Sequence, residues 1–415
     1  MKQKNFKFLV SFMALLVSVI CMSVIAFADE PSATPGQVSG IKQIDASDAS
    51  VKISYNAVLG AKGYKIEVSE DGKTWPLSSE SYNAEAYISG LSSAKAYYVR
   101  VTAYTKYYDD NYDDHYVYGT TSAIHKVVTQ PANIQNVKQV SATTNSFTIT
   151  WDAIPGVTGY KVYQRLDDSN SPVLVATVST NKATIKNINP KNLYEFDVYA
   201  YTKGDSYTAE SDYRAYINEY SLRLVPSKLK WKDMPVDVYY KYSETIAFDF
   251  KKPAYTDGVE IRAYLYNKNK QVSKMTTTGG YESLKYIKKN TFYKLRAVGY
   301  SVINGKKKYG AWSDYMYVAQ QPDVQLKQVG TKKQLKVTWD TVKGATNYTL
   351  YASTKKDSGY KKITTTKKTS FSLKKIGKTN LKKNKTYYVY VVANKKVGKT
   401  TYKSPVSYTF YLKVE

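Results

Sequence analysis

The sequence predicts an all-β protein of four tandem two-sheet sandwiches that follow an N-terminal export signal. Three observations support this. Four prolines, Pro35, Pro131, Pro226 and Pro322, stand 96, 95 and 96 residues apart. Within each interval, apolar and polar residues alternate with the period of a half-buried strand, at similar positions. The first 28 residues have the three parts of a secretory signal.

The signal begins with three lysines, continues as an apolar run over 8–27 and ends in an Ala-x-Ala pattern at 26–28. We expect residues 1–28 to be removed on export. An uncleaved anchor stays open, because about 20 apolar residues can span a bilayer. The single cysteine, Cys21, lies inside the signal. The mature chain is therefore expected to lack thiols, which excludes disulfides and cysteine nucleophiles.

The proline spacing sets the predicted domain boundaries. We call the repeats modules 1 to 4, and they cover residues 35–130, 131–225, 226–321 and 322–415. Each has a strand that ends in an aromatic residue, namely Tyr55, Trp151, Phe250 and Trp339. About 42 to 48 residues later, each has a second strand whose tyrosines align, namely Tyr97, Tyr194, Tyr293 and Tyr387. We expect all eight side chains to lie in the cores.

An aliphatic residue precedes each aligned tyrosine by six positions, namely Leu91, Ile188, Ile287 and Leu381. This spacing resembles the corner before strand F of immunoglobulin-like sandwiches, where a tyrosine hydroxyl bonds to upstream backbone. Together with the strand B aromatic and the Gly-Tyr or Asn-Tyr opening of strand C, it makes the chain similar to the fibronectin type III family. The resemblance covers nearly all of the mature chain and implies four seven-stranded, immunoglobulin-like β-sandwiches.

Modules 3 and 4 depart from the repeat pattern in places, and the pattern does not fix the position of Trp75. Module 3 has a poorly defined first strand and an insertion over 235–244, and module 4 has extra residues before Leu381. Trp75 follows an Asp71-Gly72 hairpin turn, and a core position is favoured over a half-exposed one.

The stretch KYYDDNYDDHYVYG, from Lys106 to Gly119, is predicted to connect a strand F ending at Tyr104 to a strand G starting near Tyr118. It is the longest of the four corresponding loops and is expected at the free tip of module 1. Loops on rigid scaffolds often bind ligands, and tyrosine offers stiff, half-polar contact area. The candidate ligand-binding residues are Tyr107, Tyr108, Asp109, Asp110, Tyr112, Asp113, Asp114 and Tyr116.

Several interpretations of this tip stay open. Asp109-x-Asn111-x-Asp113 matches the first half of a calcium loop, but Asp114 stands where the turn glycine belongs and Thr120 where the bidentate glutamate belongs. No metal site is therefore predicted, but a cation held loosely by the four close carboxylates stays open. Stacking on a sugar, contact with a protein or peptide, and a solvated loop without a partner remain.

Charge increases along the chain, from nine basic and thirteen acidic residues in 29–131 to equal numbers in 132–225. Residues 226–321 have eighteen basic and eight acidic residues, and 322–415 have 22 lysines and four acidic residues. The candidate polyanion-binding residues are Lys361, Lys362, Lys367, Lys368, Lys374, Lys375, Lys382, Lys383, Lys385, Lys395 and Lys396. A further pair, Lys355 and Lys356, belongs to the same pattern.

Lysine is a hydrated point charge, so this region suits diffuse attraction to a polyanion better than recognition of one phosphate. Candidates are anionic wall polymers, sulfated glycans, acidic lipid surfaces and, as a minority interpretation, extracellular nucleic acid. A solvated surface that keeps the protein soluble is the alternative.

Nothing in the pattern predicts catalysis. The two histidines, His115 and His125, lack the spacing of a triad or a zinc site, and there is no Arg-Gly-Asp tripeptide. We expect no cofactor and a non-enzymatic, bacterial, secreted or cell-surface binding or adhesion protein. Its basic end would associate with an anionic cell-wall polymer or glycan, and its tip would contact a protein or glycan. The alternative is a passive spacer array that accompanies extracellular carbohydrate-active enzymes.

Overall fold

The computed structural model describes residues 33–109, 113–166, 171–233, 245–250, 252–406 and 408–415, without the side chains of 248–250. The predicted signal and Cys21 lie outside these residues. The chain forms two compact units: one of 1–137, 150–183 and 196–216, the other of 138–149, 184–195 and 217–415. Each is described by itself. Among the described residues, no helix has the length and apolar character needed to cross a membrane.

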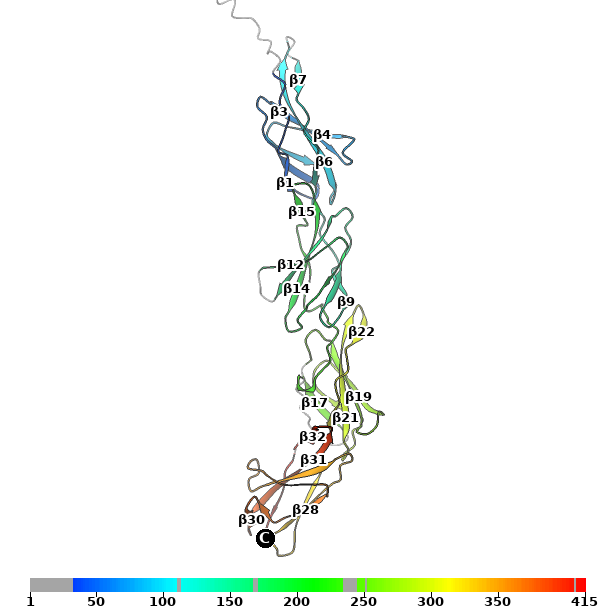
Figure 1. The fold of residues 1–415 in the computed structure, drawn as a ribbon, viewed down its shortest axis with the longest axis vertical. Coiled ribbons are helices and arrows are strands. Elements are labelled where there is room, and N and C mark those ends of the chain that lie inside the picture. The colour runs from blue at the N-terminus through cyan, green and yellow to red at the C-terminus, as the bar shows by residue number, and fades with distance from the viewer. Residues whose placement is uncertain (1–32, 110–112, 167–170, 234–244, 251, 407) are drawn as a thin grey trace, which may run out of the picture. The chain divides into compact units, whose positions relative to one another are not determined.

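Module 1 has a smaller and a larger antiparallel sheet (Figure 1). The smaller has the order β1-β2-β5, with β1 at Lys42–Ala46, β2 at Ser50–Ser54 and β5 at Glu85–Ser89. The larger has the order β4-β3-β6-β7, and β8 also pairs with β6. Its strands are β3 (Gly63–Ser69), β4 (Leu77–Ser81), β6 (Ala96–Tyr108), β7 (Asp114–Tyr118) and β8 (His125–Val128).

Module 2 repeats this strand order. Its smaller sheet consists of β9 (Lys138–Ala142), β10 (Phe147–Thr150) and β13 (Lys182–Ile185). Its larger sheet consists of β11 (Gly159–Leu166), β12 (Val173–Val178), β14 (Tyr194–Lys203), β15 (Thr208–Glu210) and β16 (Ala215–Ile217).

Module 3 has a reduced smaller sheet, in which β17 (Ile246–Phe250) pairs with β20 (Gly280–Leu284). A 3-10 turn, η1, covers Trp231–Asp233. The larger sheet has the usual order, with strands β18 (Gly258–Leu265), β19 (Gln271–Thr277), β21 (Tyr293–Ile303), β22 (Lys306–Tyr309) and β23 (Met316–Val318). The predicted insertion over 235–244 lies outside the described residues.

Module 4 again has both sheets. The smaller contains β24 (Val324–Gln328), β25 (Leu335–Trp339) and β28 (Ser370–Leu373). The larger contains β26 (Asn347–Ser353), β27 (Lys361–Thr366), β31 (Thr386–Val397), β32 (Thr400–Lys403) and β33 (Phe410–Lys413). The extra residues before Leu381 form a short hairpin of β29 (Lys375–Ile376) and β30 (Thr379–Asn380).

The predicted all-β fold of repeated immunoglobulin-like modules is confirmed. The corner tyrosines hold the backbone that leads into strand F of each module. In each module, a backbone N–H five residues upstream donates to the tyrosine hydroxyl. The pairs are Ser92 with Tyr97 at 2.8 Å, Asn189 with Tyr194 at 2.9 Å, Lys288 with Tyr293 at 3.1 Å, and Lys382 with Tyr387 at 2.7 Å. The four rings are buried. Each bond satisfies a backbone group that would otherwise lose its water on burial.

The glycine that opens strand C makes room for a tyrosine on strand F. Gly63 lies opposite Tyr104, and a Cβ built on Gly63 would come within 2.4 Å of the Tyr104 hydroxyl oxygen. Gly258 and Tyr300 form a similar pair in module 3. Module 4 has asparagine at both positions, and Asn394 Nδ2 donates to Asn347 Oδ1 at 2.8 Å. The facing residues on strands C and F therefore change together. The space between the strands holds either one tyrosine beside a glycine or two asparagines.

The last strand of each module differs from the prediction, because it is divided into two short strands. In module 1, β7 pairs with residues 104–108 of β6 and β8 pairs with 96–99. A serine stands in the gap. Ser122 N–H donates to Val101 O at 3.0 Å, and Ser122 Oγ accepts from Val101 N–H at 2.9 Å. Ser313 and Ser404 repeat both bonds. The two hydrogen bonds of the serine replace bonds that an uninterrupted strand would make. The sequence pattern did not predict this role.

The predicted core aromatics are buried where their side chains are described. Trp151, Trp339 and Tyr55 are 2%, 5% and 6% exposed, whereas the side chain of Phe250 is not described. The favoured core position of Trp75 was wrong. Its ring is half-buried, with the Arg100 guanidinium carbon 4.2 Å from the ring centroid. A cation–π contact on the sheet surface replaces core packing.

Candidate functional site

The predicted tip loop is mostly a β-hairpin (Figure 1). Strand β6 continues to Tyr108 and β7 begins at Asp114, so the connection is shorter than the predicted one. Cross-strand pairs such as Lys106 with Tyr116 and Tyr108 with Asp114 extend the ladder beyond the sandwich. Two of the candidate residues, Asp110 and Tyr112, lie outside the described residues. Over 104–108 and 114–118, the tip is therefore a two-sided β-hairpin arm.

One side of the arm brings together Tyr108, Asp114, Tyr116 and Lys106. The Lys106 ammonium lies 3.3 Å from Asp114 Oδ2 and 5.3 Å from the centre of the Tyr108 ring. Hydrogen bonds to Tyr108 and Asp114 raise the pKa of Lys106 above its ordinary value. The Asp114 carboxylate and, to a smaller extent, burial raise the pKa of Tyr116. Both tyrosines, at 45% and 43% exposure, remain available for contact.

The opposite side contains Tyr107, Asp109 and His115. The rings of Tyr107 and His115 stack with centroids 5.3 Å apart, and His115 Nε2 lies 2.8 Å from Asp109 Oδ2. Asp109 Oδ1 accepts from the Asp113 N–H at 3.0 Å. Asp109 is thus engaged in closing the turn. The predicted residues consequently divide between two faces, so they do not form one continuous site.

No group of three or more metal-ligating side chains occurs within the described parts of the chain. Asp110 and Asn111, which belong to the weak calcium-loop match, fall outside those parts. Asp109 and Asp113, which are described, are bonded to each other through the turn.

The candidate lysines of module 4 spread over strands and loops. Lys361 and Lys362 lie on β27, and the remaining ones lie in the β27–β28 turn, near β29, before β31 and on β31. All but Lys395 are exposed. Residues 322–415 are described except for Ser407. Among these described residues, no lysine forms an ion pair with a carboxylate. The ion pairs of the described residues instead belong to modules 1 to 3.

Lys395 departs from the predicted set. Its ammonium lies 4.5 Å from the centre of the Tyr266 ring, and its side chain is half-buried. Desolvation by burial lowers its pKa. Within this unit Lys395 packs on module 3 and is less available to a polyanion than the exposed lysines.

The outer face of the larger sheet carries a carboxylate in each of modules 1 to 3, half-buried in module 1 and buried in modules 2 and 3. In module 1, Arg100 Nε lies 2.8 Å from Glu67 Oε2. In module 2, Arg165 and Arg214 both lie 2.6 Å from Asp197, whose side chain is 1% exposed. In both modules the carboxylate pairs with arginine on the same face.

In module 3, Arg262 and Lys274 hold Glu260 at 2.6 and 3.1 Å. Burial alone would raise the pKa of Glu260, but the hydrogen bonds from Lys274 and Arg262 outweigh it and hold the pKa below its ordinary value of 4.5. Above the unfolded-state pKa, the carboxylate therefore stabilises module 3.

This stabilisation should disappear as the pH falls through the folded-state pKa of Glu260. At neutral pH we expect Glu260→Gln to be less stable than the wild type, by about 2 kcal/mol. Well below pH 4 the two proteins should converge, because the wild-type carboxyl is also neutral. Urea unfolding followed at both pH values checks this, and a difference that does not change with pH would contradict it.

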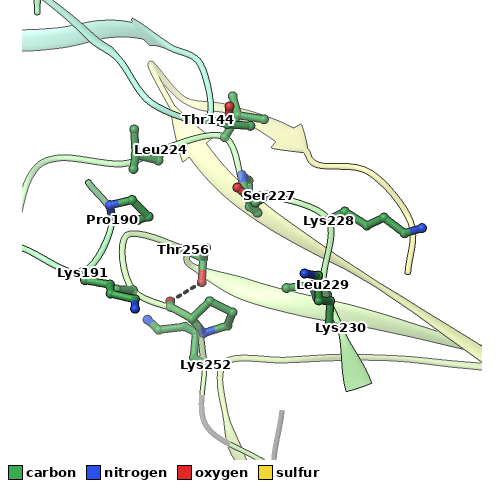
Figure 2. Close-up of a pocket in the computed structure, with 14 residues that line it drawn as sticks. Thr144, Pro190, Lys191, Leu224, Ser227, Lys228, Leu229, Lys230, Lys252 and Thr256 are labelled. Atoms are coloured by element: carbon green, nitrogen blue, oxygen red, sulfur yellow. Dashed lines mark hydrogen bonds between the residues drawn. The ribbon is translucent and has the colours of Figure 1, made fainter. Parts of the chain in front are cut away.

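A cavity of about 650 Å³ lies beside Pro226 in the second unit (Figure 2). Its walls include Pro190, Leu224 and Pro253, and four lysines, Lys191, Lys228, Lys230 and Lys252, also line it. Lys228 Nζ is bound to Asp314 at 2.7 Å, and Thr256 Oγ donates to the Pro253 carbonyl at 2.6 Å. The lining contains no carboxylate, histidine or cysteine.

Comparison with known proteins agrees with this architecture. Residues 132–215 match the fibronectin type III domain. The match covers most of module 2, and domains of this kind are commonly non-enzymatic binding, adhesion or spacer modules. Modules 1 and 4 repeat its strand order, and module 3 repeats it in the larger sheet.

Two solved structures are similar to the chain. The FN1–FN3 domains of chicken CNTN1 are 18% identical, with 69% of this chain and 98% of that chain covered and a TM-score of 0.27. A two-domain fibronectin type III segment of chicken tenascin is 14% identical, with 44% and 98% covered and a TM-score of 0.26. At these scores, neither likeness bears on function.

Proposed function

We propose that this is an exported, non-enzymatic binding protein whose module 4 holds it on an anionic polymer of a cell surface. The observation that supports the proposal is the unpaired charge of module 4. Its candidate lysines, except Lys395, are exposed, and within the described part of 322–415 they lack carboxylate partners. Unpaired lysines lose little by exchanging bound counterions for a polyanion, so attraction outweighs desolvation at the surface.

The direct test is retention of the full chain on polyphosphate-coated and on neutral dextran-coated beads. We expect retention on the polyanion at low salt, loss at high salt, and no retention on the neutral surface. Equal retention on both surfaces, or retention that salt does not weaken, would refute the proposal.

The tip arm provides the second contact in this proposal, with a protein or a glycan. Tyr108 and Tyr116 are exposed next to Lys106 and Asp114, so one face offers aromatic surface and both charges. Such a mixed surface suits specific contacts more than diffuse attraction.

Replacing Tyr108 and Tyr116 by serine should therefore abolish binding to the ligand found on a glycan or protein array. Tyr107 is the matched control, because its ring stacks on His115 on the other side. We expect Tyr107→Ser to retain more binding than the double variant. An array that detects no ligand for the wild type would favour the passive spacer instead.

A further inference from the structure

The outer face of the larger sheet in module 4 is lined by tyrosines. Tyr351 on β26 lies opposite Tyr390 on β31, and Tyr388 on β31 lies opposite Tyr411 on β33. Tyr360, just before β27, packs on Tyr390. The strand neighbours Ala352, Val389 and Val391 are fully buried, so alternation places the four strand tyrosines on the outside. We call these five residues the tyrosine face.

The rings of this face contact one another, one pair stacked and two pairs tilted. The centroids of Tyr351 and Tyr390 are 4.9 Å apart at an interplanar angle of 23°. Those of Tyr360 and Tyr390 are 4.8 Å apart, and those of Tyr388 and Tyr411 are 5.8 Å apart. The rings of Tyr351, Tyr360 and Tyr390 therefore cover parts of one another, whereas Tyr411 is 69% exposed, and ring edges and hydroxyls are left for an external partner. Ring edges carry partial positive charge, and a phenol can donate a hydrogen bond.

The hydroxyls differ in how they are used. The Tyr360 hydroxyl donates to the Lys356 carbonyl at 2.5 Å. Those of Tyr351, Tyr388, Tyr390 and Tyr411 have no hydrogen bond to any residue that the structure describes. Four donors thus remain on one face of a sheet.

Two lysines flank the strand tyrosines of this face, and one carboxylate, Asp357, lies near Tyr360, whose pKa is raised by burial and, to a smaller extent, by that charge. Lys362 lies opposite Tyr351 on β27, and Lys413 follows Tyr411 by two residues on β33, which puts both on the side of the tyrosines. In modules 1 to 3, the same face carries Glu67, Asp197 or Glu260 bound to arginine. Module 4 has replaced that internal ion pairing with hydroxyl donors and unpaired positive charge, which is complementary to an external anion.

We propose that the tyrosine face binds an acidic polysaccharide. The inference rests on the proposed function, because it names the partner class of module 4. Sugar hydroxyls would exchange hydrogen bonds with the phenols, while the acidic groups would lie near Lys362 and Lys413. Single-stranded nucleic acid fits less well, since successive bases need several free ring faces for stacking, and here the rings of Tyr351, Tyr360 and Tyr390 pack on one another.

The test uses the full chain with the substitutions Tyr388→Phe, Tyr390→Phe and Tyr411→Phe, which remove the hydroxyls and keep the rings. Its probes are polygalacturonate, polyphosphate, neutral dextran and oligothymidylate. We expect binding to polygalacturonate to weaken about tenfold or more, with binding to polyphosphate nearly unchanged. The matched control changes three exposed tyrosines elsewhere, Tyr82, Tyr213 and Tyr286, and should bind as the wild type does.

Each other outcome overturns the inference in a distinguishable way. Unchanged polygalacturonate binding in the triple variant refutes the tyrosine face but leaves the proposed function intact if polyphosphate still binds. Equal losses for polygalacturonate and polyphosphate show that the face does not recognise sugar. Tighter wild-type binding to oligothymidylate, lost in the variant, assigns the face to nucleic acid. Failure of the wild type to bind any polyanion refutes the proposed function itself.

Discussion

Replacing Phe292 by alanine is expected to destabilise module 4 by about 3 to 5 kcal/mol, although the residue belongs to the predicted range of module 3. Phe292 is fully buried in the same apolar cluster as Trp339, Leu335 and Leu381. Its N–H donates to the Lys343 carbonyl at 2.9 Å, which fixes its backbone beside that cluster. Truncation would leave a cavity that these neighbours cannot fill without moving.

Hydrogen exchange read by mass spectrometry can assign this loss to a region. We expect amides of β25, β26 and β31 to lose protection, while those of β18 retain it. The matched control is Phe371→Ala, because Phe371 is only half-buried at the edge of the same cluster and should cost less. Loss of protection confined to module 3 would show that Phe292 belongs to the other core.

Replacing six exposed lysines of module 4 by glutamine is expected to weaken binding to polyphosphate about 100-fold or more at low salt. The six are Lys367, Lys368, Lys374, Lys375, Lys382 and Lys383. Each exposed charge contributes only about 0.2 to 1 kcal/mol, but six acting on one polymer add to a large change. The salt dependence should also become shallower, because fewer counterions are exchanged.

The matched control removes the same number of exposed, unpaired charges from modules 1 and 2. It changes Lys42, Lys62, Lys73, Lys138, Lys182 and Lys186 to glutamine. Titration of both variants on a polyphosphate surface, at low and high salt, distinguishes the effect of the position of the lysines on affinity from the effect of net charge. Equal weakening in the two variants would mean that overall charge, rather than module 4, drives the binding.

Repeat spacing and strand pattern were enough to predict the fold and the corner tyrosines. Tyr97, Tyr194, Tyr293 and Tyr387 recur at fixed distances from an aliphatic residue, and a hydrogen bond five residues away is local in sequence. Buried strand aromatics follow from the period of two. The domain boundaries at the prolines stay a prediction.

The site residues could be predicted only in part. The tip was found from its composition, but spacing could not show that Tyr107 and Tyr108 lie on opposite sides of a hairpin. Lys395 has the same sequence context as Lys396, yet it packs on Tyr266 from another module. Trp75 was placed in the core because nothing local indicates that Arg100, 25 residues later, covers its ring.

The sequence by itself determined that this is an all-β repeat protein with its positive charge concentrated towards the C-terminus, because strand periodicity and composition are local properties. The tertiary structure decided which charges are already paired. Glu67 meets Arg100 and Asp197 meets Arg165 across neighbouring strands, whereas Tyr351 and Tyr390 meet each other at the corresponding place in module 4. Pairing across strands depends on register between segments about 30 to 40 residues apart, and that register is set by the packed core.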